Sequence, residues 1–96
     1  MIITDKEELK TGRVLIDFWA EWCGPCRVSK PKVEKLANDN PDLKVYFCNV
    51  DEDHILSDKY QIRSIPTLVY LEDDVMIKRA VGVLTDQQLS DIITRS

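Results

Sequence analysis

The sequence predicts a single α/β domain in which strands and helices alternate around a mixed sheet. Two near-continuous apolar runs, at residues 14–20 and 43–50, are rich in β-branched and aromatic residues, as strands covered on both faces are. An amphipathic segment separates them, which predicts a parallel pair joined by a helical crossover. Two later strand segments are close enough in sequence to form an antiparallel hairpin. The 96 residues suffice for one core but not for two.

The N-terminal elements follow from apolar patterning and capping signals. Residues 1–3 fit a short strand. Thr4, followed three residues later by Glu7, fits a capping box and predicts a helix over 5–10 that ends near Gly12. The strand over 14–20 contains one carboxylate, Asp17, and burial in an apolar strand is expected to raise its pKa.

A helix is predicted to begin at Pro25 and to bury one stripe of side chains. The stripe contains Cys26, Ser29, Val33, Leu36 and Ala37, whereas Lys30 lies off it. Pro31 lies inside the pattern and predicts a kink, because proline lacks an amide donor and its ring clashes with the preceding turn. Turn-forming residues at 38–42 separate this helix from the strand over 43–50.

The second half of the chain adds a short helix, a hairpin and a final helix. The helix is predicted over 55–60, and the hairpin strands over 67–71 and 75–81, joined by 72–74. Thr85 and Gln88 form a second capping box, which marks the start of the last helix. The predicted order is therefore βαβαβαββα, and without a repeat or linker residues 1–96 are predicted to form one domain.

Charge and composition argue against several classes of function. The formal net charge is −4, with Lys and Arg scattered, which favours neither nucleic acid nor an anionic membrane as a partner. No basic and apolar leader begins the chain, and no apolar run is long enough to cross a bilayer, so a soluble, cytoplasmic protein is expected. Three cysteines without a secretion signal predict a site rather than a disulfide scaffold.

Cys23 and Cys26 are the residues expected to carry the chemistry. Two cysteines separated by two residues can close a small disulfide, and Cys23 precedes a helix whose unpaired amides favour a thiolate. The thiolate is the attacking form of sulfur, and Arg27 is expected to add to its stabilisation. Cys23 is therefore predicted to be the exposed nucleophile and Cys26, one turn deeper, the resolving thiol.

Half of a zinc site is the alternative interpretation of this spacing. It requires two more soft ligands, and the remaining candidates are Cys48 in a predicted strand and His54, the only histidine. Cys48 is expected to be a buried apolar thiol and His54 an exposed residue at a helix start, so no metal is expected. The acidic residues 51–53 are expected to form a solvated loop or helix start.

Residues 18–26, FWAEWCGPC, resemble the active-site segment of the thioredoxin family. The similarity extends to Asp17, Pro31, residues 49–51, 62–67 and 81–82, and so spans nearly the whole chain. It implies the thioredoxin fold, a central mixed five-stranded sheet in the order 1-3-2-4-5 with helices on both faces, in agreement with the alternation above. Gly24 and Pro25 between the cysteines imply a reductant rather than a strong oxidant.

The resemblance also implies a role for Asp17. It would accept the proton of Cys26, through water, as that thiol attacks the mixed disulfide between Cys23 and substrate. A structurally tolerated buried acid is the alternative. Thioredoxins commonly have a lysine near this aspartate, whereas this chain has Phe47 there. Without that cation, protonated Asp17 should be further favoured, which predicts a differently tuned proton relay.

Further parts of the site are implied by the same resemblance. Ile65 and Pro66 resemble the cis-proline loop, which faces the disulfide and offers the Ile65 backbone to an extended substrate; an ordinary trans proline is the alternative. The flat apolar docking surface around Cys23 would comprise Trp22, Gly24, Ile65, Pro66, Val81 and Gly82, with Pro25 as active-site support. Ser64 and Asp74 replace common glycines, and aspartate tolerates the left-handed conformation of a hairpin turn.

The predicted function is a protein-disulfide reductase that cycles between a dithiol and a disulfide. Its partners would be disulfide-containing proteins and a separate thioredoxin reductase, and the chain, expected to be a monomer, has no Gly-rich loop for a cofactor of its own. One alternative is a non-catalytic thioredoxin-fold binding subunit, which would keep its function without its cysteines. The other is a glutaredoxin-like, glutathione-dependent enzyme, against which Trp22 and the Gly-Pro spacer argue.

Overall fold

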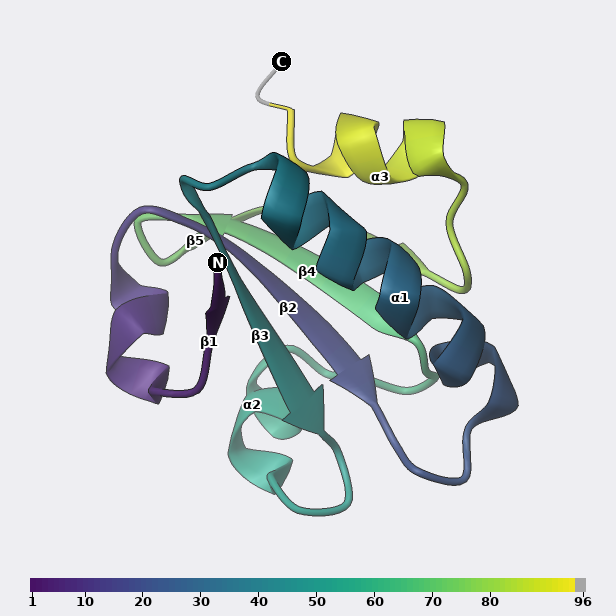
Figure 1. Cartoon of the computed structure of the whole chain (residues 1–96). Helices are drawn as coiled ribbons and strands as arrows, with labels where there is room; N and C mark the ends of the chain where they lie inside the picture. The colour runs from purple at the N-terminus through teal and green to yellow at the C-terminus, as the bar shows by residue number, and fades with distance from the viewer. Residues whose placement is uncertain (95–96) are drawn as a thin grey trace.

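The computed structural model describes residues 1–94, and these form a five-stranded sheet in the order β1-β3-β2-β4-β5 (Figure 1). The strands are β1 (Ile2–Ile3), β2 (Arg13–Trp19), β3 (Leu43–Asn49), β4 (Thr67–Glu72) and β5 (Val75–Val81). β3 pairs in parallel with both β1 and β2, and β4 runs antiparallel to β2 and β5. The predicted mixed sheet and its strand order are confirmed. Of the predicted range 1–96, residues 95–96 lie outside the described residues.

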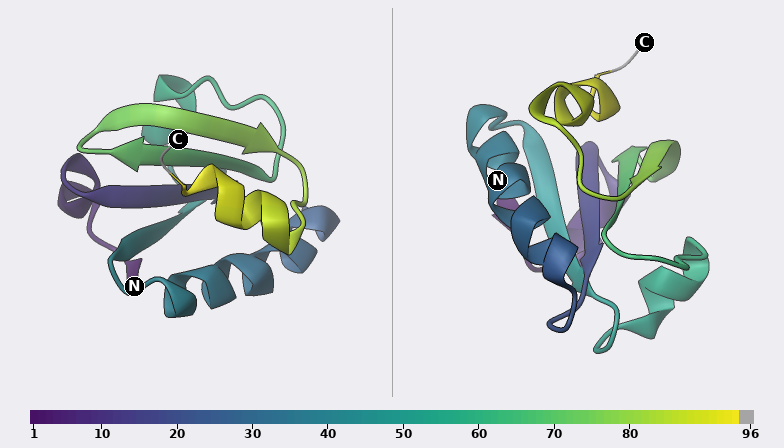
Figure 2. Two further views of the ribbon diagram at one scale, coloured as in Figure 1. Left: turned by 90° about the horizontal axis from the view of Figure 1, so that it is seen from above. Right: turned by 90° about the vertical axis from the view of Figure 1, so that its right-hand side faces the viewer.

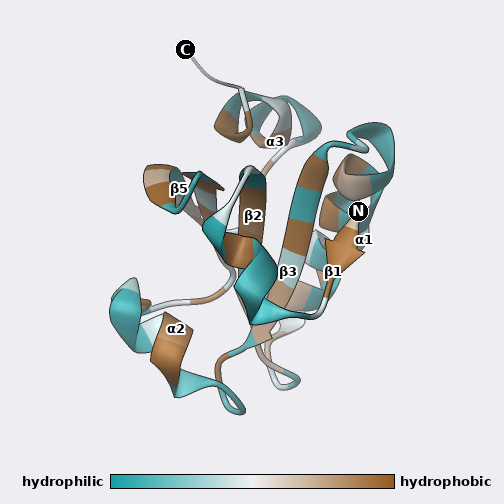
Figure 3. Ribbon diagram, turned by 90° about the vertical axis from the view of Figure 1, so that its left-hand side faces the viewer, coloured by the Kyte–Doolittle hydropathy of each residue, from teal (hydrophilic) through white to brown (hydrophobic). Residues whose placement is uncertain are grey.

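Helices cover both faces of this sheet (Figure 2). They are the 3-10 helix η1 (Lys6–Lys10) and the α-helices α1 (Gly24–Asp39), α2 (His54–Lys59) and α3 (Asp86–Ile92). Leu15 of β2 belongs to the core beneath α1 and α3, whereas its neighbour Ile16 belongs to the core beneath η1 and α2. Successive strand residues point to opposite faces, so β2 contributes apolar side chains to both sides of the sheet. Figure 3 colours β2 by the hydropathy of its residues, and hydrophobic brown is prominent where the strand is visible.

The capping box predicted at Thr4 and Glu7 is wrong. The N-cap of η1 is Asp5, whose Oδ1 accepts a hydrogen bond of 2.9 Å from the backbone N of Glu7. The segment is a 3-10 helix, the tighter form used in short pieces, and the acceptor comes from two residues before Glu7 rather than three. Gly12, with a φ of 75°, follows the helix in a left-handed conformation that suits glycine.

The other element boundaries lie within about one residue of their predicted positions. Pro25 lies in the first turn of α1, where its missing amide donor is not needed. Pro31 lies inside α1, which continues to Asp39 although this proline withholds one hydrogen-bond donor. The helix therefore spans the whole segment between the cysteines and the turn before β3.

Aspartates form the tight turn between β4 and β5. Asp73 and Asp74 have φ values of 49° and 70°, and aspartate is among the few residues other than glycine that adopt this region readily. The side chain of Asp73 also accepts a hydrogen bond of 2.8 Å from the backbone N of Gly12. The hairpin turn is therefore fixed to the start of β2, and the expected tolerance of Asp74 is confirmed.

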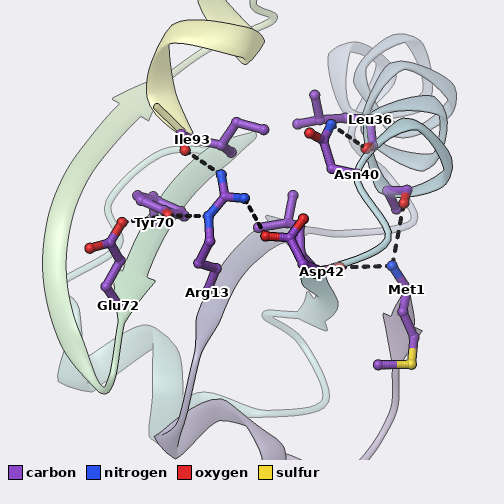
Figure 4. A network of polar contacts seen from close by, with 10 residues as sticks. Met1, Arg13, Leu36, Asn40, Asp42, Tyr70, Glu72 and Ile93 are labelled. Atoms are coloured by element: carbon purple, nitrogen blue, oxygen red, sulfur yellow. Dashed lines mark hydrogen bonds and ion pairs between the residues drawn. The ribbon is translucent and has the colours of Figure 1, made fainter. Parts of the chain in front are cut away.

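Hydrogen bonds cap the start of α3 and attach its end to the sheet. The predicted capping box is confirmed: the N of Gln88 donates to Thr85 Oγ1 at 3.1 Å, and the N of Thr85 donates to Gln88 Oε1 at 2.9 Å. At the other end of α3, the Arg13 guanidinium donates to the carbonyl of Ile93 at 2.5 Å (Figure 4).

Arg13 makes two further contacts, one with β4 and one with the turn before β3. It donates to Tyr70 Oη at 2.8 Å and pairs with Asp42 at 2.7 Å, which holds the pKa of that carboxyl below its usual range (Figure 4). Arg13 begins β2, so this network lies at the opposite end of the strand from the cysteines.

Candidate active site

The cysteine pair lies where β2 ends and α1 begins. Cys23 and Cys26 form a disulfide, with their Cα atoms 5.3 Å apart. Cys23 is the N-cap of α1, and its Sγ accepts a hydrogen bond of 3.2 Å from the backbone N of Cys26. Amides at a helix start favour negative charge on the group they face. The environment of Cys23 therefore suits a thiolate once the disulfide is reduced.

Both cysteines are buried in this disulfide form. The exposed fraction is 4% for Cys23 and 3% for Cys26, so the prediction that Cys23 is the exposed member is wrong. The loop before β4 contributes to this burial, because the carbonyl oxygen of Ile65 lies 3.8 Å from Cys23 Sγ. These two residues are 42 positions apart in the chain, and their contact agrees with the expectation that the loop at Ile65 faces the disulfide.

The loop that carries Pro66 adopts the predicted conformation. The Ile65–Pro66 peptide bond is cis. The carbonyl of Pro66 accepts a hydrogen bond of 2.8 Å from the N of Gly82, whose φ of 96° is one that glycine favours. Segments around Cys23, Ile65 and Gly82 therefore meet at one end of the sheet.

The predicted docking residues surround the disulfide but differ in accessibility. Trp22 and Val81 are exposed, Ile65 and Gly82 are half-buried, and Gly24 is exposed beside the cysteines. Pro66 was predicted to belong to this surface, yet it is buried. It supports the surface from below instead of adding exposed area to it.

Asp51 also belongs to this region, and its local sequence pattern gave no sign of the contact that it makes there. Its Oδ2 accepts a hydrogen bond of 2.8 Å from the indole Nε1 of Trp22, which orients the ring beside the cysteines. A pocket of about 550 Å³ next to this pair is lined by Trp22, Asp51, His54, Arg63 and six further residues. Asp51 was expected only to be solvated, because its acidic neighbours dominate the local pattern.

Asp17 is buried in β2 without a hydrogen bond to its Oδ1 from the described residues. Its exposed fraction is 1%, and its neighbours across the sheet are Phe47 of β3 and Leu68 of β4. Burial disfavours the charged form and raises the pKa of Asp17 to about 7, which confirms the predicted direction. A carboxyl with this pKa can exchange protons near neutral pH.

A cation acts on Asp17 from α1, although the strand position beside Asp17 holds Phe47 in place of a lysine. Phe47 does lie beside it on β3, but Lys30 of α1 acts on the carboxylate and lowers its pKa against the larger effect of burial. The Nζ of Lys30 lies 5.1 Å from the ring centroid of Trp19 and 5.3 Å from that of Phe47. Sequence periodicity placed Lys30 off the buried stripe of its helix and gave no sign of this contact.

The remaining candidates occupy separate places in the fold. Cys48 is a buried free thiol on the other side of the sheet, and burial raises its pKa to about 11. His54 is the exposed first residue of α2, as predicted. Residues 1–94 contain no cluster of three or more side chains of the types that commonly hold a metal ion. None of the helices in the same range is long and apolar enough to cross a membrane.

Comparisons with known proteins give one family. The family model described as Thioredoxin matches residues 4–95, a range that contains Asp17, both cysteines of the disulfide and Pro66. The chain is 38% identical over 87 residues to the thioredoxin of Chlamydia pneumoniae, an alignment that covers 91% of this chain and 85% of that protein.

Solved structures show the same similarity to thioredoxins. A mutant thioredoxin from Halobacterium salinarum NRC-1 matches with a TM-score of 0.84 and 36% identity, over 97% of this chain and 86% of its own. A chain from a study of the thiol resolving mechanism in yeast mitochondrial 1-Cys peroxiredoxin via glutathione/thioredoxin systems has a TM-score of 0.82 and 28% identity. That match covers 96% of this chain and 91% of the other.

Proposed function

The chain belongs to the thioredoxin family, and from this premise we propose how its residues carry out disulfide exchange and on which substrates. Family membership and the Cys23–Cys26 disulfide make the protein a thiol–disulfide oxidoreductase. We propose that it acts as a reductase of disulfides in proteins. The observation that carries the proposal is a disulfide at the start of α1, with an amide of that helix donating to Cys23 Sγ.

Cys23 is the proposed nucleophile. In the dithiol form its thiolate attacks one sulfur of a substrate disulfide, forms a mixed disulfide and releases the other substrate sulfur as a thiolate. The amides at the start of α1 stabilise the negative charge on the attacking sulfur. Cys26 then attacks Cys23 Sγ and releases the second substrate thiolate. Two electrons have passed from the cysteine pair to the substrate.

Asp17 is the proposed proton acceptor for Cys26. The Cys26 thiol must lose its proton before it attacks, and a buried carboxylate with a pKa of about 7 is well matched to that transfer. Asp17 lies on β2, and the chain leads from this strand through Cys23 into α1, which carries Cys26. We propose that a water molecule relays the proton between the two groups.

The proposed substrates are proteins that present an extended segment to the surface formed by Trp22, Ile65, Val81 and Gly82. Exposed apolar side chains beside the disulfide support this role, since such patches mark interaction sites. The yeast neighbour comes from work on a peroxiredoxin, which supports thiol-dependent proteins as the partner class.

Each turnover oxidises the cysteine pair, so a separate donor must return two electrons. Family membership supports a thioredoxin reductase in this role. We further propose that the protein acts as a cytoplasmic monomer with no bound cofactor. A reductase role suits a compartment in which protein thiols are kept reduced.

Replacement of Cys26 tests the proposed mechanism. The variant Cys26→Ser keeps the nucleophile but lacks the resolving thiol, so mixed disulfides with substrate proteins should accumulate and should be released by dithiothreitol. Cys23→Ser is the matched control and should trap none. A folded Cys26→Ser protein that forms no adduct with disulfide-containing proteins would contradict the reductase proposal.

The two rival functions predict different outcomes in activity assays. A binding subunit would keep its function in the Cys23→Ser/Cys26→Ser variant, whereas a reductase would lose all turnover. A glutaredoxin-like enzyme would turn over with glutathione as donor, whereas the proposed enzyme should require a thioredoxin reductase.

A further inference from the structure

Two aromatic rings of the sheet hold the ammonium group of Lys30. Its Nζ lies 5.1 Å from the ring centroid of Trp19 on β2 and 5.3 Å from that of Phe47 on β3. Cation–π contacts become stronger as the cation loses water, and Lys30 is half-buried. The two strands beneath α1 therefore help to fix the position of the Lys30 ammonium group.

Lys30 also borders a pocket beside Cys26. Cys26 and Lys30 are four positions apart in α1 and so share one side of the helix. The pocket has a volume of about 270 Å³ and is lined by Trp19, Ala20, Glu21, Cys26, Arg27 and Lys30. The charged residues Glu21, Arg27 and Lys30 contribute to its lining, and a pocket of this size has room for water. Cys26 and Lys30 therefore line the same pocket.

Two buried polar atoms lie on the side of β2 that faces this helix. Asp17 Oδ1 and Trp19 Nε1 have no hydrogen-bond partner among residues 1–94. Their residues alternate along the strand and point to one face, the face on which Phe47 packs beneath α1. Buried polar atoms without a partner are rare, and a catalytic role or an ordered water molecule accounts for many of them.

Among the groups around Asp17, Lys30 is the one whose charge acts on the Asp17 carboxyl. Phe47 of β3 and Leu68 of β4, its neighbours across the sheet, do not titrate. The residues that α3 contributes to this core are apolar. The helix α1 contributes Cys26, whose proton is to be moved, and Lys30, which opposes the effect of burial on the Asp17 carboxyl.

We propose that Lys30 is a positioning residue for the proton step: its ammonium, held on the rings of Trp19 and Phe47 beside the pocket at Cys26, stabilises the carboxylate form of Asp17. The inference rests on the proposed role of Asp17 as proton acceptor. Lys30 transfers no proton itself. The proton of the Cys26 thiol passes to the Asp17 carboxylate, and the Cys26 thiolate then forms its bond to Cys23 Sγ while the substrate thiolate leaves.

This arrangement explains how Asp17 acts as a base near neutral pH although Phe47 lies beside it. Burial alone would hold the carboxyl protonated, and a protonated carboxyl accepts no proton. A cation that favours the carboxylate increases the fraction of Asp17 that is ready to accept the proton. The charge comes from the helix above the sheet and not from the neighbouring strand.

The titration of Asp17 tests the contact directly. Lys30→Met keeps most of the side-chain length but removes the charge, so the Asp17 midpoint, followed by carboxyl NMR in the oxidised protein, should rise by about half a pH unit or more. Lys30→Arg should keep the wild-type midpoint, because the charge remains. Lys35→Met removes the same charge from an exposed position of α1 and should leave the midpoint unchanged.

An Asp17 midpoint that is unchanged in folded Lys30→Met overturns the proposal. Lys30→Gln is titrated in the same way if Lys30→Met does not fold. The pH dependence of mixed-disulfide resolution by Cys26 gives a second readout and should move to higher pH in the charge-removal variant; an unmoved profile also overturns the proposal.

The same measurement separates the role of Lys30 from that of Asp17. Asp17→Asn should remove the midpoint near neutral pH from the resolution profile. If that variant keeps the wild-type profile, the proposed role of Asp17 fails. If Asp17→Asn alters the profile but Lys30→Met shifts neither the profile nor the NMR titration, only the inference about Lys30 fails.

Discussion

At the scale of single residues, burial decides what each side chain of the site can do. Burial has a direct effect on Asp17, because a carboxyl that is 1% exposed and lacks a hydrogen bond to one oxygen is costly to ionise. The fold tolerates this cost at the place where the proposed chemistry needs a proton acceptor. Stability and activity therefore place opposite demands on the same residue.

The free energy of unfolding should consequently fall with rising pH through the titration of Asp17. The carboxyl has a pKa of about 7 in the folded chain, above its value in the unfolded chain, so the folded state binds the proton more tightly between the two values. The penalty is absent below about pH 4 and complete above about pH 7, where it amounts to about 4 kcal/mol.

Urea unfolding of the oxidised protein measures this effect. Between pH 5 and pH 8 the wild type should lose about 2–3 kcal/mol that Asp17→Asn does not lose. Asp39→Asn, an exposed substitution on α1, is the control and should follow the wild type. Equal pH dependence of Asp17→Asn and wild type would contradict the raised pKa.

At the scale of secondary-structure elements, the helix starts show which capping residues expected from the sequence act as caps in the structure. Thr85 and Gln88 make both hydrogen bonds of a capping box at α3, whereas Asp5 replaces Thr4 as the cap of η1. Cys23 occupies the same structural position at α1, with sulfur as the acceptor. The reactive cysteine therefore also serves as the cap of the helix that activates it.

Two threonine substitutions compare a cap that forms with one that does not. Thr85→Ala removes the side-chain acceptor for the Gln88 amide and should lower the free energy of unfolding by about 1 kcal/mol. Thr4→Ala, the same chemical change at the N-terminal position, should cost much less, because Asp5 is the cap there. Equal losses in denaturant titrations would contradict the assignment of Asp5.

At the scale of the whole molecule, the two ends of the sheet have different roles. The carboxyl end of β2 carries the disulfide, and the start of the strand carries Arg13, which joins β2 to Tyr70, Asp42 and the end of α3. The Arg13 contacts that attach α3 therefore lie at the opposite end of β2 from the disulfide.

Removal of the Arg13 network should loosen α3 and leave the redox site intact. Arg13→Met keeps the apolar stem but loses all three partners, and we expect a loss of about 2–3 kcal/mol in the free energy of unfolding. Hydrogen exchange should rise first in α3, while disulfide reductase activity at low temperature stays at the wild-type level. Unchanged exchange in α3 would show that the core beneath it suffices.

Lys10 provides the matched control for the loss of charge at Arg13. It pairs with Glu7 within η1, and both side chains are largely exposed, so their ion pair adds little to stability. Lys10→Met should change the free energy of unfolding by less than about 0.5 kcal/mol.

The sequence by itself determined the elements and the identity of the reacting groups. Apolar runs, capping residues and prolines act over a few positions, so the strands, the helix starts and the Cys23–Cys26 pair are visible along the chain. The order of the strands and the cis bond before Pro66 came from the resemblance to a family, and the structure agrees with both.

The tertiary structure decided the environment of those groups. The burial of both cysteines, the hydrogen bond from Trp22 to Asp51, and the position of Lys30 near Asp17 all depend on contacts between separate segments. Such contacts depend on how helices pack on the sheet, and periodicity within one segment contains no information about them. The sequence therefore identifies the reacting atoms, whereas contacts between separate segments of the folded chain set their proton affinities and their accessibility.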